Sequence, residues 1–181
     1  MKLFLTSGGI TNASIHRALV DLLDKPISEC AALCIPTASY GHPRGTPAGA
    51  WRFITGKGNP MTDLGWKSMG VLELTALPSI AKDRWMRWVA DADVLLVDGG
   101  DALYLAYWMR QSGLADFLQA QPAIFPHLDY PTFPENTMAC AERWAATLGC
   151  PSYAIDDQTA IKVVDGNVEV VSEGHCRHFP G

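Results

Sequence analysis

The chain has 181 residues, a formal net charge of −5 at pH 7 and a pI of about 5.4. Hydrophobic residues make up 48% of the sequence and charged residues 18%, which excludes a disordered chain and is typical of an ordinary globular protein. The length suits one domain, and we expect residues 1–181 to form it.

Charge and hydropathy patterns also exclude several partners. No block of Lys or Arg is present to neutralise phosphates, so we expect no nucleic-acid binding. No apolar run approaches the ~20 residues that a membrane helix needs, and the N-terminal run is too short for a signal peptide, so we expect no membrane partner. Five cysteines without a C-x-x-C spacing favour reduced thiols in a cytoplasmic protein. A homo-oligomer stays open.

Predicted strands and helices alternate along the chain. Apolar runs predict strands within residues 2–6, 31–38, 67–77, 93–97, 123–130, 152–157, 159–166 and 167–174. Amphipathic spacing predicts helices that begin near residues 12–14, 46–47, 79, 102 and 134, with a break at Gly113 in the fourth.

Cap and turn residues support these boundaries. Thr46 followed by Pro47 is typical of a helix N-terminus, and Gly149 of a helix C-terminus. The turn Asp165-Gly166-Asn167 predicts a hairpin between the last two strands. Because strands alternate with helices, we expect an α/β fold with a doubly wound, mostly parallel sheet in three layers. The C-terminal hairpin would add short antiparallel strands at the sheet edge.

Three polar turns follow predicted strands: Ser7-Gly8-Gly9, Asp98-Gly99-Gly100-Asp101 and His127-Leu128-Asp129. In doubly wound sheets, ligands bind outside the carboxyl ends of the strands. Glycine pairs there let backbone N–H groups hold a phosphate, a carboxylate or a developing oxyanion, although the same glycines also suit a tight turn. Neither G-x-G-x-x-G nor the P-loop motif is present, which disfavours a nucleotide cofactor.

The histidines offer two further candidate sites. His127 ends an apolar strand, where its ring can act as a general base or can be a structural histidine with satisfied hydrogen bonds. Asp129 is either a functional carboxylate or a turn residue. His175, Cys176 and His178 have metal-ligand chemistry, but no fourth ligand accompanies them, so we expect no metal site.

Four stretches in this order resemble the peptidase E family of serine peptidases, which includes the aspartyl dipeptidases. They are LFLTSGG at residues 3–9, VLLVDGGDALYL at 94–105, IFPHLD with PENT at 124–137, and YAIDDQTAIKVVDG at 153–166. The resemblance runs along nearly the whole chain. It implies the α/β sandwich of the class I glutamine-amidotransferase-like superfamily.

The resemblance also implies an activity and its residues. The family cleaves dipeptides with an N-terminal aspartate, using a Ser nucleophile, a His base and an acidic orienting residue, without metal or organic cofactor. His127 matches the catalytic His, and Gly99 and Gly100 match the turn that supplies oxyanion-hole N–H groups, a donor type that contributes about 3 kcal/mol in comparable hydrolases. From their positions at strand ends we expect Ser7, Gly8, Gly9, Asp101 and Asp129 to contact the substrate. Asp156 and Asp157 also match a family motif; we interpret them as a turn between strands, and a role in shaping the cleft stays open.

The sequence departs from the family at the nucleophile. The family carries a G-x-S-A-G elbow on the strand after the GGD helix, and neither G-x-S-x-G nor G-x-C-x-G occurs in this chain. Ser68 in GWKSMG has the wrong spacing, and Ser112 in RQSG falls in a predicted helix. About one βα unit is missing between residues 119 and 123, and the acidic partner of the triad, which we expect from that segment, has no clear match. Two functions stay open: a dipeptidase, or an inactive homologue that binds a small acidic peptide or carboxylate or has a structural or regulatory role.

Overall fold

The computed structural model describes residues 2–117 and 123–181. The chain forms two compact units. The first unit contains Met1–Asp24 and Ala120–Gly181, and the second contains Lys25–Gln119. The predicted gap between residues 119 and 123 lies outside the described residues.

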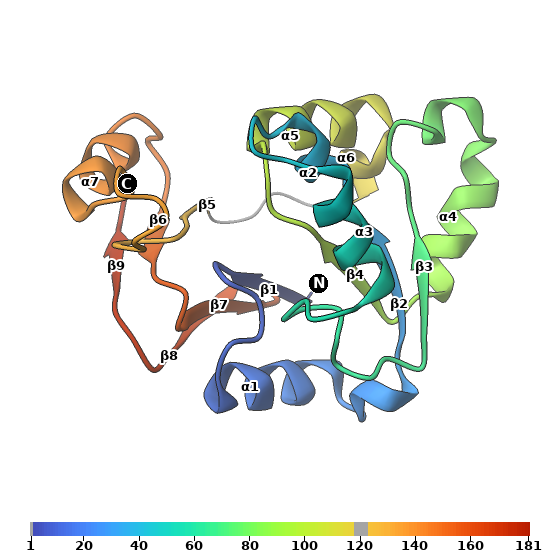
Figure 1. The fold of residues 1–181 in the computed structure, drawn as a ribbon, viewed down its shortest axis with the longest axis horizontal. Coiled ribbons are helices and arrows are strands. Elements are labelled where there is room, and N and C mark those ends of the chain that lie inside the picture. Colours follow the sequence, from blue (N-terminus) through green and yellow to red (C-terminus); the bar gives the residue numbers. More distant parts are fainter. Residues whose placement is uncertain (1, 118–122) are drawn as a thin grey trace. The chain divides into compact units, whose positions relative to one another are not determined.

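The second unit is built on a parallel three-stranded sheet in the order β3-β2-β4 (Figure 1). The strands are β2 Ala31–Ile35, β3 Ser68–Val71 and β4 Val94–Val97, and β2 pairs in register with both neighbours. The helices are α2 Thr37–Gly41, α3 Pro47–Thr55, α4 Lys82–Asp91, α5 Ala102–Gln111 and α6 Leu114–Phe117, with 3-10 turns η1 Ile27–Glu29 and η2 Leu77–Ser79.

One hydrophobic core holds the second unit together. Ile35 from the central strand and Trp85 from α4 are fully buried, together with Leu72, Leu74 and Leu114. A buried aliphatic or aromatic side chain stabilises the fold by about 1.5–3 kcal/mol. This core packs α4, α5 and α6 against the parallel sheet, as the strand-helix alternation predicts.

The first unit contains two further three-stranded sheets (Figure 1). One sheet has the strand order β1-β7-β8, and both of its pairs are antiparallel. The other has the order β5-β6-β9, in which β6 pairs parallel with β5 and antiparallel with β9. The strands are β1 Lys2–Thr6, β5 Ala123–Phe125, β6 Ser152–Ile155, β7 Thr159–Val164, β8 Asn167–Ser172 and β9 Cys176–Phe179, and the helices are α1 Ala13–Leu23 and α7 Met138–Ala145.

The local start and stop signals in the sequence explain most boundaries. Asn12 caps α1 by accepting a hydrogen bond from the Ile15 N–H, and Thr46 caps α3 with Pro47 in its first turn. Asp165 and Gly166 both have positive φ, as a two-residue turn between β7 and β8 requires. The predicted C-terminal hairpin is therefore confirmed.

Several boundaries differ from the sequence-based predictions. Strand β2 ends at Ile35 because Pro36 has no N–H to continue the ladder, and Thr37 begins a short helix. Helix α7 starts after the Thr137 cap and ends at Ala145, so Gly149 is not its cap. Strand β1 pairs antiparallel with β7, whereas alternation predicts parallel pairing. The fold is thus mixed α/β: in the described residues, the wholly parallel sheet lies in the second unit, and the first unit has one parallel pair, β5 with β6.

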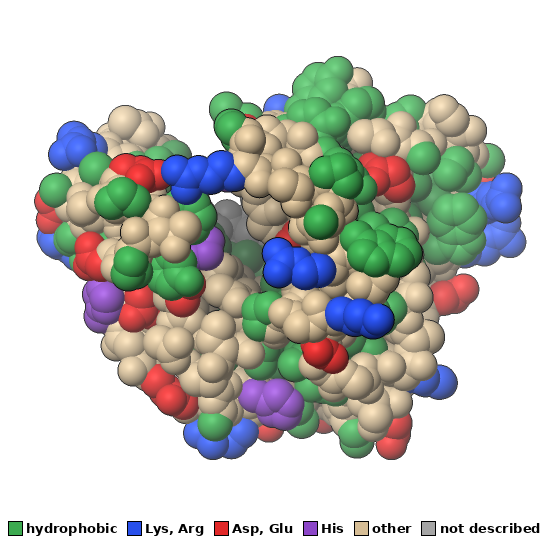
Figure 2. Space-filling view, viewed as in Figure 1, with side chains coloured by type: hydrophobic (Ala, Val, Ile, Leu, Met, Phe, Trp, Pro, Cys, Tyr) green, Lys and Arg blue, Asp and Glu red, His purple; other side chains and the backbone are tan. Residues whose placement is uncertain are grey.

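Within the described residues, no helix combines the length and apolar character needed to cross a membrane. The five cysteines are all free thiols. On the face shown in Figure 2, hydrophobic side chains lie exposed over helices of the second unit. The exposed large hydrophobic side chains on the helices of this unit are Tyr40, Trp51, Trp88, Leu103 and Tyr107.

Candidate functional site

Three polar side chains meet at the ends of three strands in the first unit. Ser7 follows β1, His127 follows β5 and Asp157 follows β6. The parallel pairing of β5 with β6 brings His127 and Asp157 to the same sheet edge. The antiparallel pairing of Thr6 with Ala160 places Ser7 beside the turn that carries Asp157. The register of the sheets therefore assembles the group.

The imidazole of His127 is held by the carboxylate of Asp157. His127 Nδ1 lies 2.7 Å from Asp157 Oδ1, and both side chains are mostly buried. The ring also stacks on Phe133, with centroids 4.9 Å apart. Because the polar contacts of the ring engage Nδ1, Nε2 is the nitrogen available to accept a proton from another group. This is the arrangement of a general base and its orienting carboxylate.

The Ser7 hydroxyl bonds both the backbone of His127 and the side chain of Asp157. Its Oγ donates to Asp157 Oδ1 at 2.5 Å and accepts from the His127 backbone N–H at 2.6 Å. The same oxygen lies 3.3 Å from His127 Nδ1, not from Nε2. A triad nucleophile needs its hydroxyl beside the nitrogen opposite the carboxylate. Ser7 therefore positions the pair and does not occupy the nucleophile's place.

Glycine and threonine residues after Ser7 also contact Asp157. A Cβ at Gly8 would lie 3.0 Å from the Asp157 side chain, so the close approach of the backbone favours glycine there. Thr11 Oγ1 donates to the Asp157 carbonyl at 2.6 Å. Gly9 has φ of 86°, as expected for a turn glycine. The predicted TSGG turn thus contacts the carboxylate that orients His127.

The loop that carries His127 is strained and internally bonded. His127 has φ of 54° and Asp129 has φ of 55°, values that cost non-glycine residues about 1–2 kcal/mol. Asn136 fixes the loop, since its side chain donates to the Pro126 carbonyl at 3.0 Å and its carbonyl accepts from the Asp129 N–H at 2.7 Å. Strained residues held by their surroundings are concentrated at functional sites. The carboxylate of Asp129 contacts His175.

The other predicted glycine turn lies in the second unit, after β4. The Gly99 N–H donates to Asp98 Oδ1 at 3.0 Å, so it would have to exchange that partner to hold an oxyanion. Ser39 also donates to Asp98. Burial raises the pKa of the Asp98 carboxyl, opposed by the hydrogen bonds from Ser39 and Gly99. Asp101 caps α5 by accepting from the Tyr104 N–H at 2.7 Å, which is a structural role.

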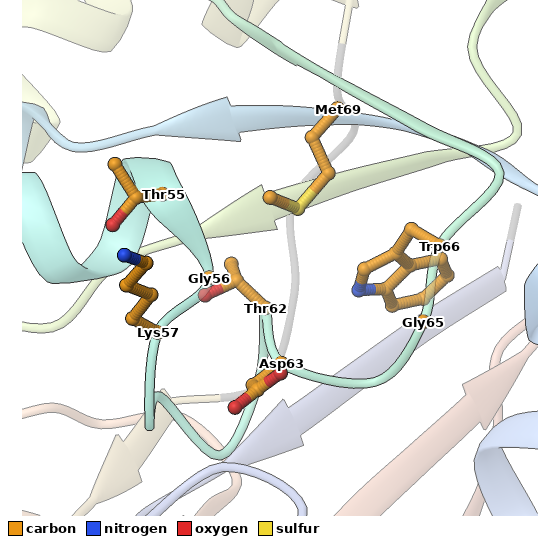
Figure 3. A pocket seen from close by; sticks show the side chains of 8 residues that line it. All are labelled: Thr55, Gly56, Lys57, Thr62, Asp63, Gly65, Trp66 and Met69. Carbon is orange, nitrogen blue, oxygen red and sulfur yellow. The ribbon is translucent and has the colours of Figure 1, made fainter.

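The second unit also carries a cavity of about 240 Å³ between the end of α3 and β3 (Figure 3). The apolar surface comes from Trp66 and Met69, and the charged groups are Lys57 and Asp63. The remaining lining residues are Thr55, Gly56, Thr62 and Gly65. None of the residues predicted for the site from the sequence lines this cavity.

The two serines that lie nearest to an elbow in sequence are not placed as nucleophiles. Ser68 is the first residue of β3. Ser112 is buried at the end of α5, where its hydroxyl donates to the Met109 carbonyl at 3.1 Å. Both positions agree with the sequence-based prediction that neither serine belongs to a nucleophile elbow.

The residue that sequence reasoning missed is Asp157. The sequence predicts a turn at Asp156 and Asp157, and predicts the acidic partner of His127 from the missing segment. One feature of the sequence could have identified it: two acidic residues directly follow a fully buried strand. Residues at the carboxyl ends of such strands face the edge of the sheet where ligands bind. Register between β5 and β6 is what selects Asp157, and register cannot be derived from either strand alone.

Comparisons with known proteins support the fold. A solved structure from Listeria monocytogenes EGD-e, of a protein provisionally assigned as a peptidase E, aligns with a TM-score of 0.61 at 15% sequence identity. The alignment covers 96% of this chain and 98% of that chain. No family model and no curated protein matches the sequence. The chain therefore has a peptidase E-like fold, established from structure.

Proposed function

We propose that the chain acts as a serine-type dipeptidase of peptidase E type, which hydrolyses dipeptides with an N-terminal aspartate in the cytoplasm. The observation that carries the proposal is the 2.7 Å contact between His127 Nδ1 and Asp157 Oδ1. The structural likeness to a protein provisionally assigned as a peptidase E supports the assignment as a hydrolase. The proposal also includes a three-layer α/β sandwich, as the sequence resemblance implies. The preference for aspartate comes from the sequence resemblance.

The proposed chemistry uses His127 as general base. In this reaction a Ser Oγ attacks the peptide carbonyl, the Nε2 lone pair of His127 takes the hydroxyl proton and passes it to the leaving amine, and the Asp157 carboxylate stabilises the imidazolium that forms. The sequence contains no nucleophile elbow that would carry this Ser. The oxyanion-hole role that the sequence resemblance implies for Gly99 and Gly100 stays a prediction of that resemblance. No metal or organic cofactor is required by this reaction.

Turnover of an Asp-Leu dipeptide tests the proposal. We expect Asp157→Asn to lower kcat by about 10²–10⁴-fold, because the amide favours the wrong tautomer of His127, and His127→Ala to lower it at least as much. Asp21→Asn, an exposed change on α1 of the same unit, is the matched control and should leave kcat unchanged. No turnover by the intact protein, beside an active homologue, would contradict the proposal.

Binding without turnover is the second candidate, because the sequence lacks a nucleophile elbow and the Ser7 hydroxyl already has a donor and an acceptor role. In this case the chain would bind a small acidic peptide or carboxylate, or keep a structural or regulatory role. A serine-directed fluorophosphonate probe separates the candidates. Labelling supports the peptidase, whereas calorimetric binding of Asp-Leu without labelling or turnover supports the inactive homologue.

A further inference from the structure

The cavity of the second unit lies at the amino end of β3, away from the glycine turn after β4. Trp66 lies just before this strand, and Met69 belongs to it. The chain leaves the carboxyl end of β2 and returns to the amino end of β3 through α3, so Gly56, which ends this helix, also lines the cavity. Because β3 and β4 both pair parallel with β2, the cavity and the turn after β4 lie at opposite ends of the strands.

One hydroxyl in the cavity wall is buried without a partner: Thr62 is 3% exposed, and the described residues give its Oγ1 no hydrogen bond. Leaving a buried hydroxyl unpaired is costly, so such groups are few in folded proteins. By contrast, the Thr55 hydroxyl donates to the Trp51 carbonyl at 2.8 Å. The indole N–H of Trp66 donates to the Met61 carbonyl at 3.1 Å. The Thr62 hydroxyl is therefore the group of this wall that a ligand can satisfy.

Hydrogen bonds within the loop after α3 hold this wall in place. Asn59 Oδ1 accepts from the Met61 N–H at 2.9 Å and from the Thr62 N–H at 3.1 Å. Asp63 Oδ2 accepts from the Gly58 N–H at 3.0 Å. The loop is thus shaped before any ligand arrives, as is usual for sites that bind small molecules.

The size and the lining of the cavity limit the kind of ligand. Its volume of about 240 Å³ lies between the roughly 150 Å³ that holds a benzene ring and the roughly 300–1,000 Å³ of a site for a drug-sized molecule. In Figure 3, Thr62 lies between Lys57 on one side and Trp66 on the other. With Met69 beside the indole ring, the cavity has one charged end and one apolar end, which suits a small amphipathic molecule.

The two charged side chains of the lining have opposite signs. In the described part of the chain, Lys57 forms neither a hydrogen bond nor an ion pair, and Asp63 uses only Oδ2. A carboxylate would accept from Lys57 and from the Thr62 hydroxyl, and an ammonium group would donate to Asp63. A ligand with only one of these groups would leave the like charge of the wall uncompensated. A zwitterion is matched by both side chains.

We propose that this cavity binds a small α-amino acid with an apolar side chain. Lys57 and Thr62 bind its carboxylate, Asp63 binds its ammonium group, and Trp66 and Met69 contact its side chain. Because Lys57 and Asp63 are exposed, their contributions are modest and screened by salt, and the buried hydroxyl and the apolar surface supply most of the affinity. The site belongs to the second unit and does not rest on the proposed function.

Indole N–H NMR of the intact protein, titrated with L-leucine to about 10 mM, tests the proposal. The Trp66 signal, assigned by its absence in Trp66→Phe, should shift saturably, and the signals of the exposed Trp51 and Trp88 should not. Glycine, which has no apolar side chain, should bind at least about tenfold more weakly. Leucinamide, which has no carboxylate, and 4-methylpentanoate, which has no ammonium group, should each bind at least about twofold more weakly.

Two substitutions with matched controls separate binding from folding. Thr62→Val removes the hydroxyl and keeps the branched shape, so leucine should bind about tenfold more weakly, while the urea midpoint stays or rises because the hydroxyl has no partner. Thr75→Val, at an exposed position of the same unit, should bind leucine as the native protein does. Lys57→Met should weaken binding by about two- to fivefold, whereas Lys82→Met, outside the cavity, should not.

The results can overturn the proposal in three ways. The first is no saturable shift of the Trp66 signal up to about 10 mM leucine. The second is leucine binding that Thr62→Val and Lys57→Met both leave unchanged. The third is equal binding of 4-methylpentanoate and leucine, which would exclude an ammonium site at Asp63 and with it the amino-acid class. None of these measurements requires hydrolysis of a dipeptide, so failure of the proposed function leaves them unaffected.

Discussion

At the scale of single residues, the glycine pair after β4 has two members with different roles. Gly100 has φ of 148°, and a Cβ there would lie 2.2 Å from the Ala38 carbonyl oxygen, whereas a Cβ at Gly99 meets nothing within 4 Å. We expect Gly100→Ala to destabilise the protein by about 2–4 kcal/mol, through backbone strain and overlap. Gly99→Ala, the matched control, should stay within about 0.5 kcal/mol of the native protein.

Urea unfolding of both variants checks this prediction. The midpoint of Gly100→Ala should fall clearly below that of Gly99→Ala. Equal midpoints would mean that the turn relaxes around the new methyl group and that Gly100 is not required by the fold.

The candidate site shows which single residues a sequence can identify. His127 is found because a histidine at the end of an apolar run is chemically conspicuous, and the structure places it beside a carboxylate. Asp157 is not found, because its role depends on the pairing of β5 with β6, which lie far apart in the chain. Ser7 is expected to contact substrate, which stays a prediction; in the structure its hydroxyl bonds His127 and Asp157, because the antiparallel pairing of β1 with β7 places it beside them.

At the scale of elements, two variants of Asp101 distinguish a role in helix capping from a role in substrate binding. Its carboxylate accepts from the Tyr104 N–H at the start of α5. Asp101→Ala should therefore cost about 1 kcal/mol, whereas Asp101→Asn should keep the cap and nearly all of the stability. Thermal unfolding measures both. If Asp101→Asn keeps the native Tm but raises the KM for Asp-Leu, Asp101 also contacts the substrate.

Elements themselves are largely predictable here because their signals are local. Asn12, Thr46 and the Asp165-Gly166 turn mark boundaries through hydrogen bonds within a few residues of chain. The boundaries that the sequence predicts wrongly depend on the tertiary environment. The predicted strand over residues 67–77 shortens to Ser68–Val71, because pairing with Ala31–Cys34 sets its length.

At the scale of the whole molecule, composition and alternation predict the α/β class but not the division of the sheets. Alternation favours parallel pairing for the strands that precede the C-terminal hairpin, whereas β1 and β9 pair antiparallel with strands distant in sequence. The fold shared with the Listeria monocytogenes structure at 15% identity agrees with a fold maintained by burial pattern more than by particular side chains.

Global stability should depend on a buried thiol at alkaline pH. Burial, with a smaller contribution from Asp98, raises the pKa of Cys34 from 9.0 to about 11. The unfolded chain releases this proton first, so the contribution of Cys34 is complete below pH 9 and is lost as the pH rises through about 11. The native protein should therefore lose more stability between pH 8.5 and 10.5 than Cys34→Ala does.

Tryptophan fluorescence is the suitable probe, because five of the six tryptophans, Trp51, Trp66, Trp85, Trp88 and Trp108, lie in the unit that contains Cys34. The comparison uses the change in urea midpoint with pH, so that the cavity left by the alanine, which acts at every pH, cancels. Cys150→Ala, at an exposed position, should follow the native pH dependence. If Cys34→Ala follows it as well, the thiol does not contribute to the alkaline loss of stability.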